Sequence, residues 1–168
     1  MFINNLDKKV IEWSYCALFV IVPLIWVPQT SELFEFNKII ATYILTVIIL
    51  TAWAIRCILE KCLIFRRTIL DIPLLVFLIT SVLSLFFSID MHTSWFGYYS
   101  RFNGGLLSLL AYASLYWAFV SNMSAKATVL STQCAVLTAT IIAIYGILEH
   151  FGVSLSCVLT TGQANVAC

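Results

Sequence analysis

Five apolar runs, each about 18 to 21 residues long, alternate along the chain with short islands that hold nearly all of its charged residues. The runs are predicted at residues 10–27, 39–59, 69–89, 106–123 and 128–148. A run of this length lets a helix cross the apolar core of a bilayer, where backbone N–H and C=O groups must bond to one another. The pattern predicts an all-α fold, a polytopic bundle of about five transmembrane helices.

The composition supports a membrane protein over a soluble one. Hydrophobic residues make up 62 % of the 168 residues and charged residues 10 %, whereas soluble domains average about 45–50 % and about 25 %. The net charge of +1 says little about partners. The expected partner is therefore the lipid bilayer, and no nucleic acid is expected.

The distribution of basic residues predicts the orientation. Seven of the nine basic residues fall on one side of the predicted spans, namely Lys8, Lys9, Arg56, Lys61, Arg66, Arg67 and Lys126. Only Lys38 and Arg101 fall on the other side. The positive-inside rule then places the N-terminus in the cytoplasm and the C-terminus outside.

Two distinctive segments lie on the predicted external side. Residues 1–152 form the helical domain, with an external loop at 88–105, and residues 153–168 form a polar external tail. The first run, 10–27, has the basic flank of a secretory signal but no small-residue cleavage site, so we interpret it as a retained span. In the tail, Cys157 and Cys168 are expected to form a disulfide in an oxidising compartment.

The 88–105 loop is the candidate site. Arg101 lies among aromatic residues and is followed by a glycine pair at the start of the next run. One interpretation is an anion site, because a guanidinium binds phosphate bidentately and a helix N-terminus attracts it. The other is an anchoring role, in which Arg101 pairs with Asp90 or with a lipid headgroup. The anion site would comprise Arg101, Tyr98, Tyr99, Asn103 and Gly104.

Both histidines of the chain lie on the predicted external side, each close to a carboxylate. His92 follows Asp90, and His150 follows Glu149, so proton transfer or ligand binding is open for both. The alternative is a solvated histidine at the membrane interface. Asp71, in the first turn of the third run, is interpreted as a structural carboxylate at the positive end of a helix dipole. No motif for a metal or a cofactor is present, and neither is expected.

Several segments together resemble the bacterial O-antigen ligase and polymerase family. The resemblance is carried by Phe87-Ser-Ile-Asp90, Ser94-Trp-Phe-Gly97 and Ser100-Arg-Phe-Asn-Gly-Gly-Leu106, which are similar to the early external loop of such proteins. The segments 23–38 and 145–152 are similar to the first loop and to the end of the fifth span.

The resemblance implies a glycan transferase of the bacterial cytoplasmic membrane. Members move a glycan from a polyprenyl-diphosphate carrier to an acceptor at the outer face, and an external arginine holds the diphosphate. That role carries over to Arg101, while the acceptor is unknown. Members also have further spans and a later external loop with a histidine, so this chain is expected to be an N-terminal, truncated portion.

Two further functions are considered. The first is a small, non-enzymatic membrane scaffold that binds lipid or a partner through the 88–105 loop. The second is transport, which is disfavoured because the charged residues within the predicted spans, Glu12, Arg56 and Asp71, all lie near span ends.

Overall fold

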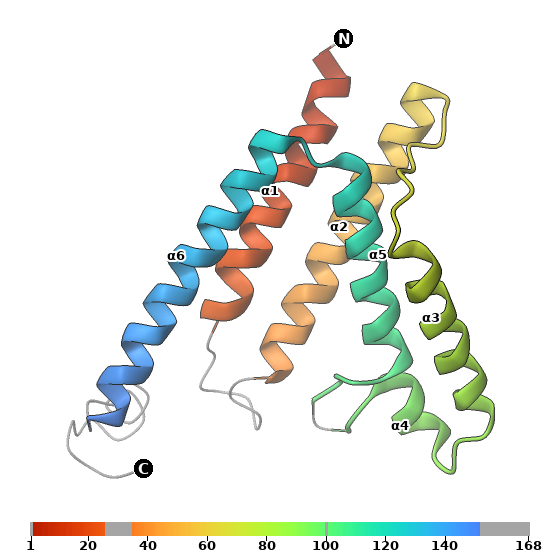
Figure 1. The fold of residues 1–168 in the computed structure, drawn as a ribbon, viewed down its shortest axis with the longest axis vertical. Coiled ribbons are helices and arrows are strands. Elements are labelled where there is room, and N and C mark those ends of the chain that lie inside the picture. The colour runs from red at the N-terminus through yellow and green to blue at the C-terminus, as the bar shows by residue number, and fades with distance from the viewer. Residues whose placement is uncertain (1, 26–34, 100, 152–168) are drawn as a thin grey trace.

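The computed structural model describes residues 2–25, 35–99 and 101–151, and within them the chain is all-α, as predicted. Each predicted run overlaps one long helix, although several of these helices begin before the run or end after it (Figure 1). A short helix that was not predicted lies within the 88–105 loop. In chain order the helices are α1 (Phe2–Leu24), α2 (Glu35–Glu60), α3 (Asp71–Phe86), α4 (Met91–Phe96), α5 (Leu106–Asn122) and α6 (Ala125–His150).

The helix lengths differ from the predicted spans. Among the described residues, α2 and α6 are long and apolar enough to cross a membrane. The apolar helices α3 and α5 have 16 and 17 residues, about 24 and 26 Å, which is less than the roughly 30 Å of a bilayer core. The 23 residues of α1 include charged residues in its first half, which shortens its apolar stretch.

The five long helices form a bundle in which α1 lies between α2 and α6 (Figure 1). On the other side of α2 comes α5, and α3 packs against α5 at the outer edge of the bundle. This order places α4 beside the first turn of α5, at the end of the bundle opposite the N-terminus. The candidate loop therefore caps the α3–α5 side of the bundle.

The core lies where α1, α2 and α5 meet. Its buried side chains come from all three helices and are Ile11, Tyr15, Ile49, Ala52, Leu115 and Ala118. The Tyr15 hydroxyl donates a hydrogen bond to the Leu115 carbonyl at 2.6 Å, and the Tyr15 ring meets the edge of Phe119 at 5.1 Å. The buried hydroxyl thus has a partner, as a polar group in an apolar core requires.

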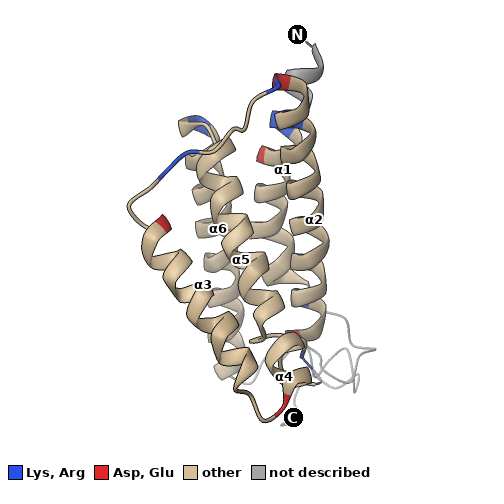
Figure 2. Cartoon of the chain, turned by 90° about the vertical axis from the view of Figure 1, so that its right-hand side faces the viewer, with Lys and Arg blue, Asp and Glu red and all other residues tan. Residues whose placement is uncertain are grey.

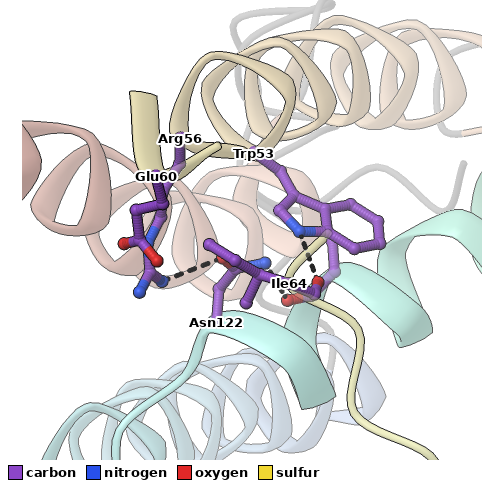
Figure 3. A network of polar contacts seen from close by, with 6 residues as sticks. Trp53, Arg56, Glu60, Ile64 and Asn122 are labelled. Atoms are coloured by element: carbon purple, nitrogen blue, oxygen red, sulfur yellow. Dashed lines mark hydrogen bonds and ion pairs between the residues drawn. The ribbon is translucent and has the colours of Figure 1, made fainter. Parts of the chain in front are cut away.

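Polar contacts join α2 to α5 near the N-terminal end of the bundle (Figure 3). Arg56 lies 2.9 Å from Glu60 and donates a hydrogen bond to the Asn122 side-chain oxygen at 3.0 Å. The Asn122 amide nitrogen donates in turn to the Ala118 carbonyl at 2.9 Å. The Arg56 guanidinium is thereby held by side chains of both α2 and α5.

Asp71 has the structural role that its position predicts. Its carboxylate accepts hydrogen bonds from the Thr68 backbone N–H at 2.7 Å, from the Thr68 hydroxyl at 2.8 Å and from the Trp117 indole at 3.1 Å. These bonds fix the start of α3 against α5. The helix-dipole argument placed Asp71 correctly at the start of a helix. The hydrogen-bond partners of its carboxylate are Thr68, in the segment before α3, and Trp117 on α5.

Candidate functional site

The 88–105 loop begins with the short helix α4, which Asp90 caps. The Asp90 carboxylate accepts hydrogen bonds from the backbone N–H groups of His92 at 3.1 Å and Thr93 at 3.4 Å, and from the Thr93 hydroxyl at 2.5 Å. The hydroxyl bond from Thr93, followed by its backbone bond, holds the pKa of the Asp90 carboxyl below its ordinary value. Asp90 is therefore committed to the helix cap.

The loop closes where the backbones of Gly97 and Gly105 approach each other. A Cβ atom on Gly105 would lie 2.3 Å from the Gly97 nitrogen, and one on Gly97 would lie 2.2 Å from the Asn103 carbonyl oxygen. Gly97 also has φ of +89°, a conformation that favours glycine. Tyr98 donates its backbone N–H to the Asn103 carbonyl at 3.2 Å, which completes the closure.

Contacts with α2 hold the far side of the loop. The Tyr43 hydroxyl donates a hydrogen bond to the Phe102 carbonyl at 3.1 Å, and the rings of Phe36 and Phe102 lie 5.9 Å apart. Phe102 has φ of +52°, a strained value for a residue with a side chain. The bond to Tyr43 and the ring contact stabilise Phe102 in this conformation, so the chain beside Arg101 is held against α2.

Arg101 pairs with Glu35 of α2 and not with Asp90. Its guanidinium lies 3.4 Å from both oxygens of the Glu35 carboxylate, and the two side chains are 47 % and 46 % exposed. The guanidinium carbon lies 5.9 Å from the centre of the Tyr98 ring, within the range of a cation–π contact. Asp90, one of the two partners that the anchoring interpretation considered for Arg101, instead caps α4, and the other partner, a lipid headgroup, stays a prediction.

Asn103 and Gly104, predicted as anion ligands, bond within the loop. The Gly104 backbone N–H donates to the Asn103 side-chain oxygen at 2.9 Å and to the Ser108 hydroxyl at 3.1 Å. The same Asn103 oxygen accepts a hydrogen bond from the Tyr112 hydroxyl at 3.3 Å. The Gly104 N–H is therefore occupied, and the two residues shape the turn that leads into α5.

A cleft of about 520 Å³ lies beside this turn, between the loop, α3 and α5. Five hydroxyl side chains line it. The hydroxyls of Ser88 and Ser94 bond to each other, which ties the end of α3 to α4. The lining consists of Thr80, Ser81, Ser84, Leu85, Phe87, Ser88, Ser94, Gly104, Gly105, Leu106 and Leu109.

A second, apolar groove lies between α3 and α5 and shares the lining residue Leu109 with the cleft. This groove has a volume of about 590 Å³ and is lined by Leu70, Pro73, Leu74, Phe77, Leu109, Tyr112, Ala113 and Tyr116. The two neighbouring cavities thus place a polar lining beside the loop and an apolar lining along the helices, and together they can be followed as one path only across Leu109. Such a path suits a ligand with a polar head and an apolar tail.

Sequence reasoning missed this cleft although a signal for it was present. Thr80, Ser81, Ser84 and Ser88 recur at the spacing that places residues on one face of a helix. It also missed Glu35, which lies in the segment between the first two predicted runs. The pairing of Glu35 with Arg101 depends on how α2 packs against α5, which spacing along the chain does not reveal.

The two histidines lie apart. His92 is on α4, where its ring lies 5.0 Å from that of Phe96 and 5.8 Å from that of Tyr99. His150 is the last residue of α6, on the far side of the bundle from α4, and its ring lies 5.6 Å from that of Phe151 (Figure 1). They therefore do not form one site. The predicted disulfide of Cys157 and Cys168, and the whole tail 153–168, fall outside the described residues.

The fold and this loop define an all-α bundle whose loop-capped end combines an arginine with a hydroxyl-lined cleft. No three side chains of the metal-ligand types gather in the part of the chain that the structure describes. Comparison of the chain with known protein families, with characterised proteins and with solved structures finds no match. Function is therefore argued from the residues and their geometry.

Proposed function

We propose that the chain is a multi-pass protein of a bacterial cytoplasmic membrane, with its five long helices crossing the bilayer. The charged residues gather at the two ends of the bundle, and the lengths of the helices between them are almost free of charge (Figure 2). Large apolar side chains on outer helix faces are exposed, for example Val47 at 64 % and Leu137 at 62 %. Contact of such faces with lipid tails costs little free energy, whereas their contact with water is unfavourable.

Apolar residues beyond the helix ends compensate for the short α3 in this arrangement. Ile69 and Leu70 precede α3, and Phe87 and Ile89 follow it, and all four are exposed. Seven of the nine basic residues lie at the end where α1 begins, so the positive-inside rule puts this end in the cytoplasm. The 88–105 loop then lies at the outer face.

At this outer face, we propose, the chain contributes to a glycan transferase that resembles O-antigen ligases and polymerases. The observation that carries the proposal is the fixed position of Arg101 in the closed loop, at the same bundle end as the hydroxyl-lined cleft. A polyprenyl-diphosphate-linked glycan needs a cation for its diphosphate, hydrogen-bond partners for polar groups and an apolar path for its tail. The loop and the α3–α5 cavities offer all three.

Arg101 would act on the leaving group of the transfer. In the reaction, an acceptor hydroxyl forms a bond to the anomeric carbon of the glycan, and the bond from that carbon to the diphosphate oxygen breaks. The carrier leaves with additional negative charge on its diphosphate, and the hydroxyl proton goes to a base. A guanidinium beside the diphosphate stabilises that charge as it develops. Glu35 orients the guanidinium while leaving it about half exposed.

The test is binding of undecaprenyl diphosphate to the purified chain in nanodiscs. Arg101→Ala is expected to weaken binding at least about tenfold, the loss expected when a charged hydrogen bond is removed. Arg101→Lys keeps the charge but loses the fork of donors and is expected to bind more weakly than the native chain. Lys38→Ala removes the other cation of this end and serves as the matched control. Equal affinity of the native chain and both Arg101 variants would refute the assignment.

A second function, a non-enzymatic scaffold, is favoured by one contact, the Arg101–Glu35 pair. In a scaffold this pair would serve only to hold the loop against α2. Glu35→Gln separates the two functions. If Arg101 binds a diphosphate, the variant strengthens lipid binding, because the new amide oxygen still orients the guanidinium while the competing negative charge is gone. If the pair is only structural, the variant loosens the loop and leaves lipid binding unchanged.

A further inference from the structure

A strap of ten residues, 61–70, connects α2 to α3 at the basic end of the bundle without forming a helix. Three hydrogen bonds fix its path. The Trp53 indole donates to the Ile64 carbonyl at 3.0 Å, and the Arg66 backbone N–H donates to the Ser121 hydroxyl at 3.2 Å. The Thr68 hydroxyl lies 2.7 Å from that of Tyr116. Figure 3 shows the contact of Trp53 with the strap, which is thus attached to both α2 and α5.

The strap presents two kinds of side chain outward. Its large apolar residues are among the most exposed of the chain, with Leu63 at 83 % and Ile69 at 93 %. Its cations, Lys61, Arg66 and Arg67, are exposed as well. Basic and apolar side chains mixed on one surface are typical of segments that lie in the headgroup region of a membrane.

Three carboxylates at this end have hydrogen-bond or ion-pair partners other than the side chains of the strap arginines. Glu60 pairs with Arg56 at 2.9 Å, Asp71 accepts hydrogen bonds from Thr68 and Trp117, and Glu12 accepts one from Ser124 at 2.9 Å. Among the described residues, the two strap arginines form no ion pair within 4.0 Å. Arg67 interacts electrostatically with Asp71 at longer range, but both arginine side chains are exposed and can bind an external anion.

We propose that the strap is a docking surface for anionic phospholipids of the leaflet on its side of the membrane. Arg66 and Arg67 bind headgroup phosphates, while Leu63 and Ile69 enter the boundary between headgroups and acyl chains. The positive charge of the strap complements the negative charge of the lipid headgroups. Because hydrogen bonds already fix the strap backbone, lipid binding loses little conformational entropy of the chain. The proposal rests on membrane insertion but not on the diphosphate site, which lies at the opposite end of the bundle.

The probe is phosphatidylglycerol, titrated into the purified full chain in detergent, with bound lipid counted by native mass spectrometry. The variant R66Q/R67Q removes two strap cations. Each cation near an anionic membrane surface strengthens lipid binding, and the loss of two is expected to weaken it about twenty- to thirtyfold. The matched control, K8Q/K9Q, removes two cations from α1 at the same end and is expected to bind as the native chain does. R66K/R67K keeps the charge and is expected to retain part of the binding.

Three outcomes would overturn the proposal. The first is unchanged binding in R66Q/R67Q at an unchanged unfolding temperature. The second is an equal loss in K8Q/K9Q, which would show a diffuse charge effect without a defined surface. The third is displacement of the lipid by inorganic phosphate at millimolar concentration, which would show a plain anion site. Failure of the diphosphate proposal at Arg101 would change none of these results.

Discussion

Replacing Gly105 by alanine tests the closure of the candidate loop, because the structure gives the steric conflict atom by atom. The new Cβ would lie 2.3 Å from the Gly97 nitrogen and 2.6 Å from both the Phe96 carbonyl carbon and the Trp95 carbonyl oxygen. Ordinary contacts between carbon atoms are about 3.5–4.0 Å. All three neighbours are backbone atoms, so no side chain can rotate away, and the loop must move by about 1 Å or open.

The backbone of Gly105 adds no cost of its own. Its φ of −86° and ψ of 174° suit any residue, so the whole effect of Gly105→Ala is steric. We expect a loss near the upper end of the usual range for overpacking, about 3 kcal/mol. For a chain of this size that corresponds to a decrease in Tm of about 6–12 °C.

Gly104→Ala is the matched control. A Cβ on Gly104 would meet nothing within 4 Å, but its φ of +84° is unfavourable for alanine. Its expected loss is therefore conformational alone, on the order of 1 kcal/mol or about 2–4 °C. Thermal unfolding in detergent measures both variants, and limited proteolysis shows whether the cut falls in 88–105. A Gly105→Ala variant that is as stable and as protease-resistant as the native chain would refute the described closure.

Two further predictions concern single hydrogen bonds. The pKa of Asp90, measured by carboxyl NMR, should lie below the ordinary value of about 4, and Thr93→Val should raise it because the hydroxyl of Thr93 is the main cause of the shift. Folding lowers the pKa of Asp90, so the ionised carboxylate stabilises the loop above about pH 4. This stabilisation is lost as the pH falls through the pKa of the folded state. An ordinary pKa of Asp90 in the native chain would contradict the described cap. Tyr15→Phe removes the buried hydrogen bond to the Leu115 carbonyl and should lower Tm by about 2–4 °C. Tyr99→Phe removes a hydroxyl from an exposed ring and should leave Tm unchanged. Equal Tm shifts in the two variants would contradict the described core.

Much of the fold follows from patterns of residues that are local in the sequence. Each long apolar run contains a helix, because burial of apolar side chains and internal backbone bonding act along a continuous segment. Helix ends were harder to predict, since apolar residues such as Ile69 and Phe87 continue the hydrophobic pattern beyond the helix. The short α4 was missed because six residues are too few to show a helical period.

The candidate site was predicted only in part because its partners come from different helices. The sequence placed Arg101 in an aromatic setting, and the structure places it near Tyr98. Asp90 was the nearest carboxylate in the loop and was offered as its partner, yet Asp90 caps α4. Glu35 reaches Arg101 through the packing of α2 beside α5, and that packing depends on contacts between residues far apart in the chain.

The location of the two bundle ends on opposite faces of a membrane underlies every functional proposal made for this chain. It can be measured with a membrane-impermeant thiol reagent on intact cells that produce variants with one cysteine each. One variant keeps only the native, exposed Cys62 of the strap, and the other carries only Tyr99→Cys in the loop, a position that is 79 % exposed. We expect labelling of the loop cysteine in intact cells and of Cys62 only after the membrane is permeabilised. Labelling of both from the same side would contradict the proposed arrangement.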